Sequence, residues 1–187
     1  NLRLPAVRKF QQTLDINTPL QPKPSKAKLG IMAVGKTLYE INDALRSLGI
    51  NDPAKSGIGL FSIVMPWPID PDALRHFAAN YDEILVIEEK RPVVEDQIAR
   101  AVVNMTDRGL ISGKFSPDGK PLLPETGELT HEILMAAIHS RATAHDIPAD
   151  LPRIADADAP ALPSIATRTP WYCAGCPHNS STKLPDG

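Results

Sequence analysis

The chain has 187 residues, a formal net charge of -2 and a hydrophobic share of 42%, which is an ordinary composition for a globular protein with one sizeable core. This near-neutral balance argues against nucleic acid as a partner, because neutralising phosphates takes a clustered basic excess. The longest apolar run, GIGLFSIVM, ends at Pro66 and is too short to span a membrane, so no membrane partner is expected.

The first half of the chain alternates short apolar runs with amphipathic stretches. Residues 2–15, LRLPAVRKFQQTLD, are predicted to form a short helix inside an arm, residues 1–26, which we interpret as the tail of a preceding domain. KLGIMAVG, residues 28–35, has the length of a buried strand, and a helix is predicted over residues 36–49. GIGLFSIV, residues 57–64, is predicted to be a second buried strand.

The second half repeats this alternation. Asp70 is predicted to cap a helix, and EILVIEE, residues 83–89, is the clearest strand of all. Pro92 suits the first turn of the next helix. LISGKF, residues 110–115, is predicted as a further edge strand, and Thr130 as the cap of a last helix.

These elements predict an α/β fold: a three-layer, mostly parallel sheet with helices on both faces, because strands that are apolar on both sides need cover on both sides. The predicted domain spans residues 27–145. Nineteen prolines are roughly twice the usual share. Most lie outside the apolar, periodic middle, crowding into residues 19–24, 117–124 and 148–170, and indicate extended Pro-rich arms. Residues 146–169 are predicted as an Ala/Pro-rich linker. The chain has no signal peptide and no starting methionine, which favours a piece of something longer.

One stretch matches the phosphate loop of nucleotide hydrolases. GIMAVGKT, Gly30–Thr37, fits the pattern G-x-x-x-x-G-K-T, in which exposed backbone amides after a strand surround the phosphates. Here the four residues between the glycines are apolar and favour the strand itself, and the preceding PKPSKAK cannot supply another. We prefer an ordinary strand-to-helix turn and keep a nucleotide hydrolase as a minor alternative.

The clearest strand is followed by four charged residues, Glu88, Glu89, Lys90 and Arg91. In open parallel sheets, ligands bind at the carboxyl ends of the strands, and paired carboxylates suit acid–base work or a cation. A solvated charged loop, or salt bridges to a neighbouring domain, is the simpler interpretation. Trp67 follows another predicted strand, residues 57–64, at the same edge of the sheet. An exposed tryptophan at this place indicates an interface. We therefore predict an interface or ligand loop here.

Both cysteines lie in WYCAGCPHNSSTK, residues 171–183. Three interpretations compete. A zinc site would use Cys173, Cys176 and His178 but needs a fourth ligand. A thioredoxin-like redox pair would open a helix directly after a strand, whereas this pair follows a linker, and an iron–sulfur cluster needs about four thiolates, whereas this chain has two. Two unpaired structural cysteines also remain open, so the spacing supports half of a site, better suited to a reducing cytosol than to a secreted protein. The remaining histidines are predicted to be surface or half-buried residues without a spaced partner: His76, His131, His139 and His145.

RTPWYCAGCPHNSSTKLPDG resembles the opening of the thiamine-diphosphate-binding domain of indolepyruvate ferredoxin oxidoreductases, within the 2-oxoacid:ferredoxin oxidoreductase family, and most closely the long fused bacterial form. Upstream, LGIMAVGKTLYEINDALRSLGI, MPWPIDPDALRHFA, EILVIEEKRPVVEDQI, ISGKF and GELTHEIL are similar to the segment before that domain, which has the fold of the transketolase C-terminal domain. The resemblance implies that residues 27–145 are this α/β domain and residues 170–187 the truncated start of the thiamine domain.

The resemblance implies part of a cytoplasmic enzyme that oxidatively decarboxylates a 2-oxoacid, indolepyruvate foremost, to an acyl-CoA. The implied cofactors are thiamine diphosphate, magnesium and an iron–sulfur cluster, and the implied partners are the remaining domains, ferredoxin and coenzyme A. Cys173 and Cys176 match two cluster ligands, and His178 and Asn179 would lie near thiamine diphosphate.

The family's next cluster cysteine, its diphosphate–magnesium motif and its ring-activating glutamate would lie beyond Gly187. The isolated chain is therefore expected to hold no catalytic residue, to bind no cofactor and to be a structural, interdomain module without activity. A zinc-binding interaction module using Cys173, Cys176 and His178 is the first alternative, and the nucleotide hydrolase is the second.

Overall fold

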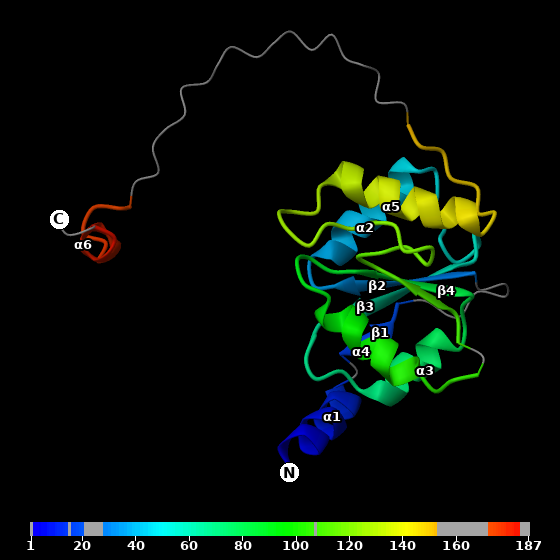
Figure 1. Cartoon of the computed structure of the whole chain (residues 1–187), viewed down its shortest axis with the longest axis horizontal. Coiled ribbons are helices and arrows are strands. Elements are labelled where there is room, and N and C mark those ends of the chain that lie inside the picture. The colour runs from blue at the N-terminus through cyan, green and yellow to red at the C-terminus, as the bar shows by residue number, and fades with distance from the viewer. Residues whose placement is uncertain (1, 15, 21–27, 107, 153–171, 184–187) are drawn as a thin grey trace, which may run out of the picture. The chain divides into compact units, whose positions relative to one another are not determined.

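The computed structural model describes residues 2–14, 16–20, 28–106, 108–152 and 172–183. The chain divides into two compact units, residues 1–152 and 153–187, and each is described by itself. The first unit contains the sheet and its helices (Figure 1). The described part of the second is a short turn followed by the one-turn helix α6 (His178–Ser181).

The first unit is built on a sheet with the strand order β1-β3-β2-β4-β5. Its central strand is parallel to both neighbours, and β5 is parallel to β4. Only β1, at the opposite edge, is antiparallel. The strands are β1 (Asn17–Pro19), β2 (Leu29–Val34), β3 (Ile58–Ile63), β4 (Glu83–Ile87) and β5 (Leu110–Ser112).

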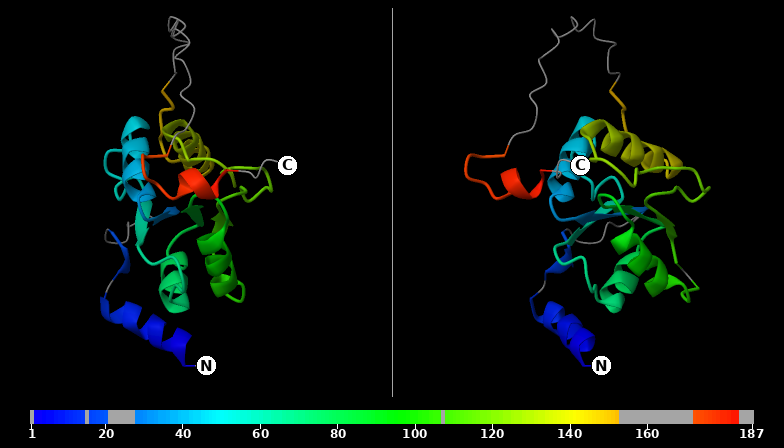
Figure 2. Two further views of the ribbon diagram at one scale, coloured as in Figure 1. Left: turned by 90° about the vertical axis from the view of Figure 1, so that its left-hand side faces the viewer. Right: turned by 60° about the vertical axis from the view of Figure 1, so that its left-hand side comes forward.

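Helices cover both faces of this sheet. The helices α2 (Thr37–Ser47) and α5 (His131–Ala144) lie on one face, and α3 (Pro71–Ala78) and α4 (Val93–Val102) lie on the other, as Figures 1 and 2 show from three directions. The three-layer α/β prediction is therefore confirmed. Among the described residues, no helix combines the length and the apolar character needed to cross a bilayer.

Alternate residues along each strand feed two separate cores. In β4, Leu85 and Ile87 pack with α2 and α5, whereas Ile84 and Val86 pack with α3 and α4. Side chains point to opposite faces along a strand, so a sheet covered on both sides requires apolar residues at successive positions. This explains why ILVI, residues 84–87, forms a continuous apolar run.

The predicted helix starts at Asp70 and Thr130 are confirmed by their side chains. The Asp70 carboxylate accepts a hydrogen bond from the backbone N–H of Asp72, and the Thr130 hydroxyl accepts one from Ile133. Each cap satisfies a backbone donor that has no partner inside the helix. These two helices are thereby fixed on opposite faces of the sheet.

Two glycines let the layer of α3 approach the sheet closely. Gly30 of β2 and Gly59 of β3 are paired in register, and a methyl group on Gly59 would overlap the Tyr81 hydroxyl. A methyl group on Gly30 would lie 2.8 Å from the Phe77 ring. The two aromatic rings themselves pack with their centroids 4.7 Å apart, so both positions require glycine for packing rather than for backbone freedom.

The structure also contains elements that the sequence did not predict. The strand β1 pairs with β3 although it lies in the predicted arm, residues 1–26. After α5, Ile147 is buried in the core between the sheet, α2 and α5, and the Asp150 N–H donates to the Leu48 carbonyl. Most of the predicted linker, residues 153–169, lies outside the described residues, so the domain boundaries stay a prediction.

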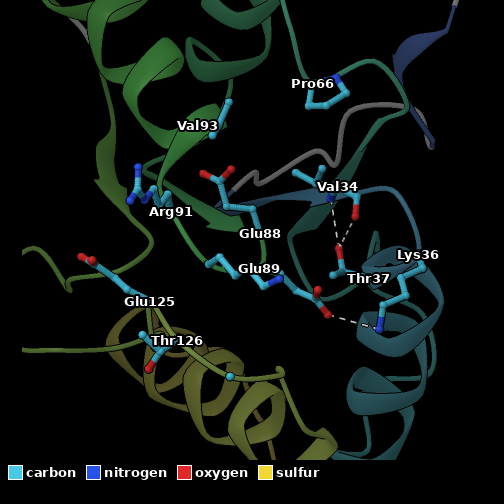
Figure 3. A pocket seen from close by; sticks show the side chains of 12 residues that line it. Val34, Lys36, Thr37, Pro66, Glu88, Glu89, Arg91, Val93, Glu125 and Thr126 are labelled. Carbon is cyan, nitrogen blue, oxygen red and sulfur yellow. Dashed lines mark hydrogen bonds and ion pairs between the residues drawn. The ribbon is translucent and has the colours of Figure 1, made fainter. Parts of the chain in front are cut away.

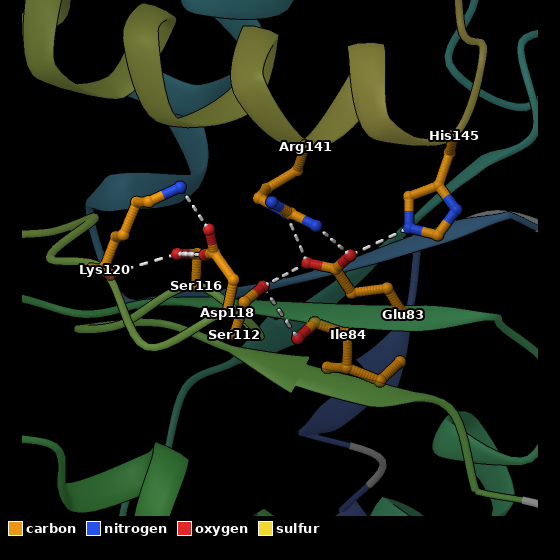
Figure 4. A network of polar contacts seen from close by, with 8 residues as sticks. All are labelled: Glu83, Ile84, Ser112, Ser116, Asp118, Lys120, Arg141 and His145. Atoms are coloured by element: carbon orange, nitrogen blue, oxygen red, sulfur yellow. Dashed lines mark hydrogen bonds and ion pairs between the residues drawn. The ribbon is translucent and has the colours of Figure 1, made fainter.

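A buried ionic cluster fastens α5 to the start of β4 (Figure 4). Glu83 is fully buried; Arg141 donates to both of its carboxylate oxygens, each at 2.7 Å, and His145 Nε2 lies 2.8 Å from Oε2. The Ser112 hydroxyl donates to Oε1 at 2.5 Å. Burial alone would raise the pKa of Glu83, but these donors outweigh it and lower the pKa. His145 is half-buried as predicted, but it has a partner that the sequence analysis missed.

Candidate functional site

A pocket of about 700 Å³ lies at the carboxyl ends of the central parallel strands (Figure 3). It brings together the turn after β2, the loop after β3, the charged loop after β4 and the segment before α5. Strand-to-helix loops converge at this edge because parallel strands end there together. The lining residues are Val34, Lys36, Thr37, Pro66, Glu88, Glu89, Lys90, Arg91, Val93, Glu125, Thr126 and Gly127.

Glu88 is buried and caps helix α4 with its carboxylate. Its oxygens accept hydrogen bonds from the backbone N–H groups of Val94, at 2.9 and 3.0 Å, and Glu95, at 2.9 Å. An anion is stabilised there by the unsatisfied amides of the first helical turn. Burial is the largest influence on the Glu88 pKa and raises it, although the amide donors oppose the shift. For Glu88, the simpler interpretation as a solvated loop residue is therefore wrong.

A buried lysine lies behind this cap. Lys114 Nζ donates to the Glu88 carbonyl at 2.6 Å and to the Pro124 carbonyl at 3.2 Å, and the Lys114 backbone N–H donates to the Glu95 carboxylate at 2.9 Å. Burial lowers the Lys114 pKa and raises the Glu95 pKa. Lys114 therefore ties the loop after β4 to the segment that precedes α5, across the back of the pocket.

Lys36 is paired with carboxylates at the pocket rim. Its Nζ lies 2.9 Å from Glu40 and 3.2 Å from Glu89, and Figure 3 shows its side chain turned toward Glu89. These partners raise the Lys36 pKa above its ordinary value. The residues before it, Gly30–Val34, belong to the buried strand β2 and do not form a loop around phosphates, so the nucleotide-hydrolase alternative is wrong.

The charged loop after β4 turns sharply. Lys90 has φ of 60°, in the left-handed region that non-glycine residues rarely adopt. This turn brings the chain back so that the Glu88 carboxylate reaches the first turn of α4. Lys90 and Arg91 are exposed and border the pocket, while Glu89 pairs with Lys36. The predicted loop is thus a sharp corner that exposes two cations, Lys90 and Arg91.

In the second unit, a tight turn brings the predicted site residues together. The Cys176 N–H donates to the Cys173 carbonyl at 3.0 Å, and the Asn179 side chain donates to the same carbonyl at 3.0 Å. Cys176 Sγ lies 3.1 Å from His178 Nδ1, and the His178 ring stacks on Tyr172 with the centroids 5.3 Å apart. Asn179 and His178 therefore support the turn that carries the two thiols.

The donor set of this turn fits half of an iron–sulfur site. Cys173 is exposed and Cys176 is half-buried, so both thiols are accessible to a cluster that prefers thiolate ligands. Among the described residues, no group of three or more histidine, cysteine, aspartate or glutamate side chains is arranged to hold a metal. The structure therefore does not support the zinc module built on Cys173, Cys176 and His178 among these residues.

The sequence analysis missed the lysine and the glutamate behind the Glu88 loop. Lys114 was assigned only to an edge strand, and Glu95 only to the helix after Pro92. A usable signal was present, because a lysine that directly follows a strand joins the same sheet edge as the carboxylates. The segment 125–127, which closes the pocket, carries no periodicity that would place it there.

Comparison with known proteins gives consistent matches. Residues 21–156 match the family model of the indolepyruvate oxidoreductase domain. Indolepyruvate oxidoreductase subunit IorA of Thermococcus kodakarensis is 28% identical over 182 residues, which is 96% of this chain and 26% of the relative. The subunit of Pyrococcus abyssi is 26% identical over 95% of this chain and 26% of its own length. The chain thus spans about a quarter of the length of these relatives.

Two solved structures are similar at a TM-score of 0.44. One is a split-gene transketolase in an inactive beta4 tetramer, 17% identical, covering 65% of this chain and 40% of that chain. The other is 2-oxoglutarate:ferredoxin oxidoreductase from Magnetococcus marinus with 2-oxoglutarate, coenzyme A and succinyl-CoA bound, 14% identical, covering 71% and 21%. We draw no conclusion from a likeness this weak.

Proposed function

The chain belongs to the indolepyruvate oxidoreductase domain family, and from that premise we propose that it is an internal part of a thiamine-dependent indolepyruvate:ferredoxin oxidoreductase. The observation that carries the proposal is the family match over residues 21–156. The CAGCPHN turn, residues 173–179, supports it because it presents two accessible thiols. In this proposal, residues 27–145 form the interdomain module and residues 170–187 begin the thiamine-diphosphate-binding domain.

The proposed reaction is the oxidative decarboxylation of a 2-oxoacid to an acyl-CoA in the cytoplasm, with electrons passed to ferredoxin. Thiamine diphosphate, held with magnesium by other parts of the enzyme, supplies an electron sink for the carbanion when it is bound. The remaining domains of the same enzyme, ferredoxin and coenzyme A are the proposed partners. Indolepyruvate is the proposed substrate because the relatives are named for it.

In this proposal, the chain provides two ligands to an iron–sulfur cluster and holds neighbouring parts of the enzyme in position. Cys173 and Cys176 provide two thiolates to an iron–sulfur cluster, and His178 and Asn179 hold their turn beside the thiamine site. In the pocket, Glu88 is committed to the helix cap and Lys36 to ion pairs, which favours a positioning role over acid–base catalysis for these groups. The loop Glu88–Arg91 then faces a neighbouring domain or a ligand that this domain helps to hold.

The test uses the full-length protein and the isolated chain side by side. The full-length protein should reduce ferredoxin when indolepyruvate and coenzyme A are supplied, and the 187-residue chain should not. Cys173→Ser in the full-length protein should abolish ferredoxin reduction, whereas Ser181→Ala, in the same exposed turn, should leave it unchanged. Decarboxylation by the isolated chain, or a fully active Cys173→Ser variant, would refute the proposal.

A further inference from the structure

A second pocket, of about 600 Å³, shares Val93 with the first. It is formed by α1 (Arg3–Leu14), the loop after β3, α3 and α4, and we call it the Trp67 groove. Its apolar wall includes Leu74 and Val93, and its charged groups include Arg8, Asp96 and Arg100. The helix α1 is held there by Gln11, whose side-chain amide donates to the Pro68 carbonyl at 2.5 Å.

The rim of this groove is unusually apolar for a surface. Of the groove's lining residues, Trp67 is 59% exposed and Val93 is 46% exposed. Exposed tryptophan is costly to leave in water and is enriched among the residues that dominate protein–protein binding energy. More than half of the Trp67 side chain is exposed among the described residues, so the groove presents an aromatic anchor.

The charges indicate what the occupant carries. Arg8 Nε is buried and has no hydrogen-bond partner among the described residues, and Arg100 is exposed at the same groove. Arg75, by contrast, is committed to the Ala101 carbonyl and to Asp72. A buried donor without a partner costs free energy, and guanidinium groups pair best with carboxylates. The groove therefore fits an occupant with an acidic side chain.

We propose that the Trp67 groove is the docking site for an acidic segment of another domain of the same polypeptide, with a carboxylate entering beside Arg8 and Arg100 and an apolar side chain against Trp67. This rests on the proposed function, in which the chain is one module of a longer enzyme. The curated relatives are about four times as long as this chain, since it spans 26% of each of the first two. Mixed apolar and charged contact is typical of interfaces between domains of one chain.

A second copy of the chain fits the groove less well. In an isologous contact the same patch meets itself, which would set two copies of a lining with three arginines and one aspartate, Arg8, Arg75, Arg100 and Asp96, against each other. Like charges placed together across an interface are unfavourable and suppress the wrong partner. The groove is therefore better matched by a different surface with the opposite charge.

The test is photo-crosslinking in the full-length protein. A benzoylphenylalanine residue is placed at position 67, and in a control at position 39, because Tyr39 is 74% exposed on α2 on the other face of the sheet. Unlabelled and nitrogen-15-labelled protein are mixed before irradiation, so that mass spectrometry separates crosslinks within one chain from those between copies. We expect crosslinks from position 67 to an acidic segment of another domain of the same chain, at least tenfold above the control.

A second variant tests the charged side of the groove. Arg100→Glu should reduce the crosslink yield from position 67 at least fivefold, whereas Arg46→Glu, on the exposed face of α2, should leave it unchanged. Crosslinks only between copies, only to a separate subunit, or no higher than the control would overturn the proposal. Ferredoxin reduction is measured in the same preparation. Activity without the crosslink would refute the docking site alone, and the crosslink without activity would refute the proposed function alone.

Discussion

Replacing Arg141 with methionine should destabilise the first unit more than any surface substitution. The guanidinium makes two hydrogen bonds of 2.7 Å to the fully buried Glu83 carboxylate. Its removal leaves that carboxylate with only the Ser112 hydroxyl and His145. Breaking a buried ion pair by removing one partner costs about 3–5 kcal/mol, because an uncompensated charge remains.

Urea unfolding followed by far-ultraviolet circular dichroism measures this cost. With a slope of about 2 kcal/mol per M, the midpoint of Arg141→Met should fall by about 2 M. The matched control is Arg46→Met, which removes an exposed ion pair to Asp43 on α2 and should barely move the midpoint. Equal midpoints for the two variants would refute the reasoning that burial makes the Glu83 cluster stabilising.

The same cluster predicts a pH dependence of definite sign. The folded pKa of Glu83 lies below its ordinary value of 4.5, so the folded state binds fewer protons than the unfolded state in that range. The stabilisation is therefore complete above about pH 4.5 and lost as the pH falls below it. Glu83→Gln should remove this acid-side loss, and a wild-type midpoint unchanged between pH 5 and pH 3 would contradict the assignment.

Three further substitutions test the packing and the charged edge. Gly59→Ala should lower the free energy of unfolding by about 1–3 kcal/mol because its methyl group meets the Tyr81 hydroxyl; an unchanged melting temperature would contradict the close approach. Burial raises the Glu88 pKa, so the wild type should lose stability as the pH rises above 4.5, and Glu88→Gln should flatten that slope in urea titrations at several pH values. Lys114→Met should cost about 1–3 kcal/mol because two buried carbonyls lose their donor; a midpoint equal to wild type would show that the carbonyls find other partners.

The sequence predicted the layers of the fold because its central strands carry apolar residues toward both faces. In β4, successive residues alternate between two cores, and an uninterrupted apolar run followed by an amphipathic helix encodes this arrangement. The helix caps at Asp70 and Thr130 could also be predicted, because each side chain binds a backbone N–H only two or three residues further along the chain. The strand β1 was missed because only three residues pair, and its proline and asparagine do not favour strands.

The site was harder to predict because its contacts are long-range. The sequence pattern favoured a solvated position for Glu88. In the structure, the turn at Lys90 places its carboxylate against the first turn of α4. Lys114 reaches the same corner from the loop after β5, the neighbouring strand of the sheet. Spacing along the chain does not encode such meetings, because they depend on how separate loops converge at one sheet edge. The pairing of His145 with Glu83, separated by 62 positions, was missed for the same reason.

The role of the paired thiols tests the account most directly. Iron and acid-labile sulfide would be quantified in the full-length protein, in Cys173→Ser/Cys176→Ser, and in Ser181→Ala, together with electron paramagnetic resonance spectra of the reduced samples. We predict that the double cysteine variant loses the iron and the signal of one cluster while the serine variant retains both. Full iron content and an unchanged spectrum in the double cysteine variant would contradict the account.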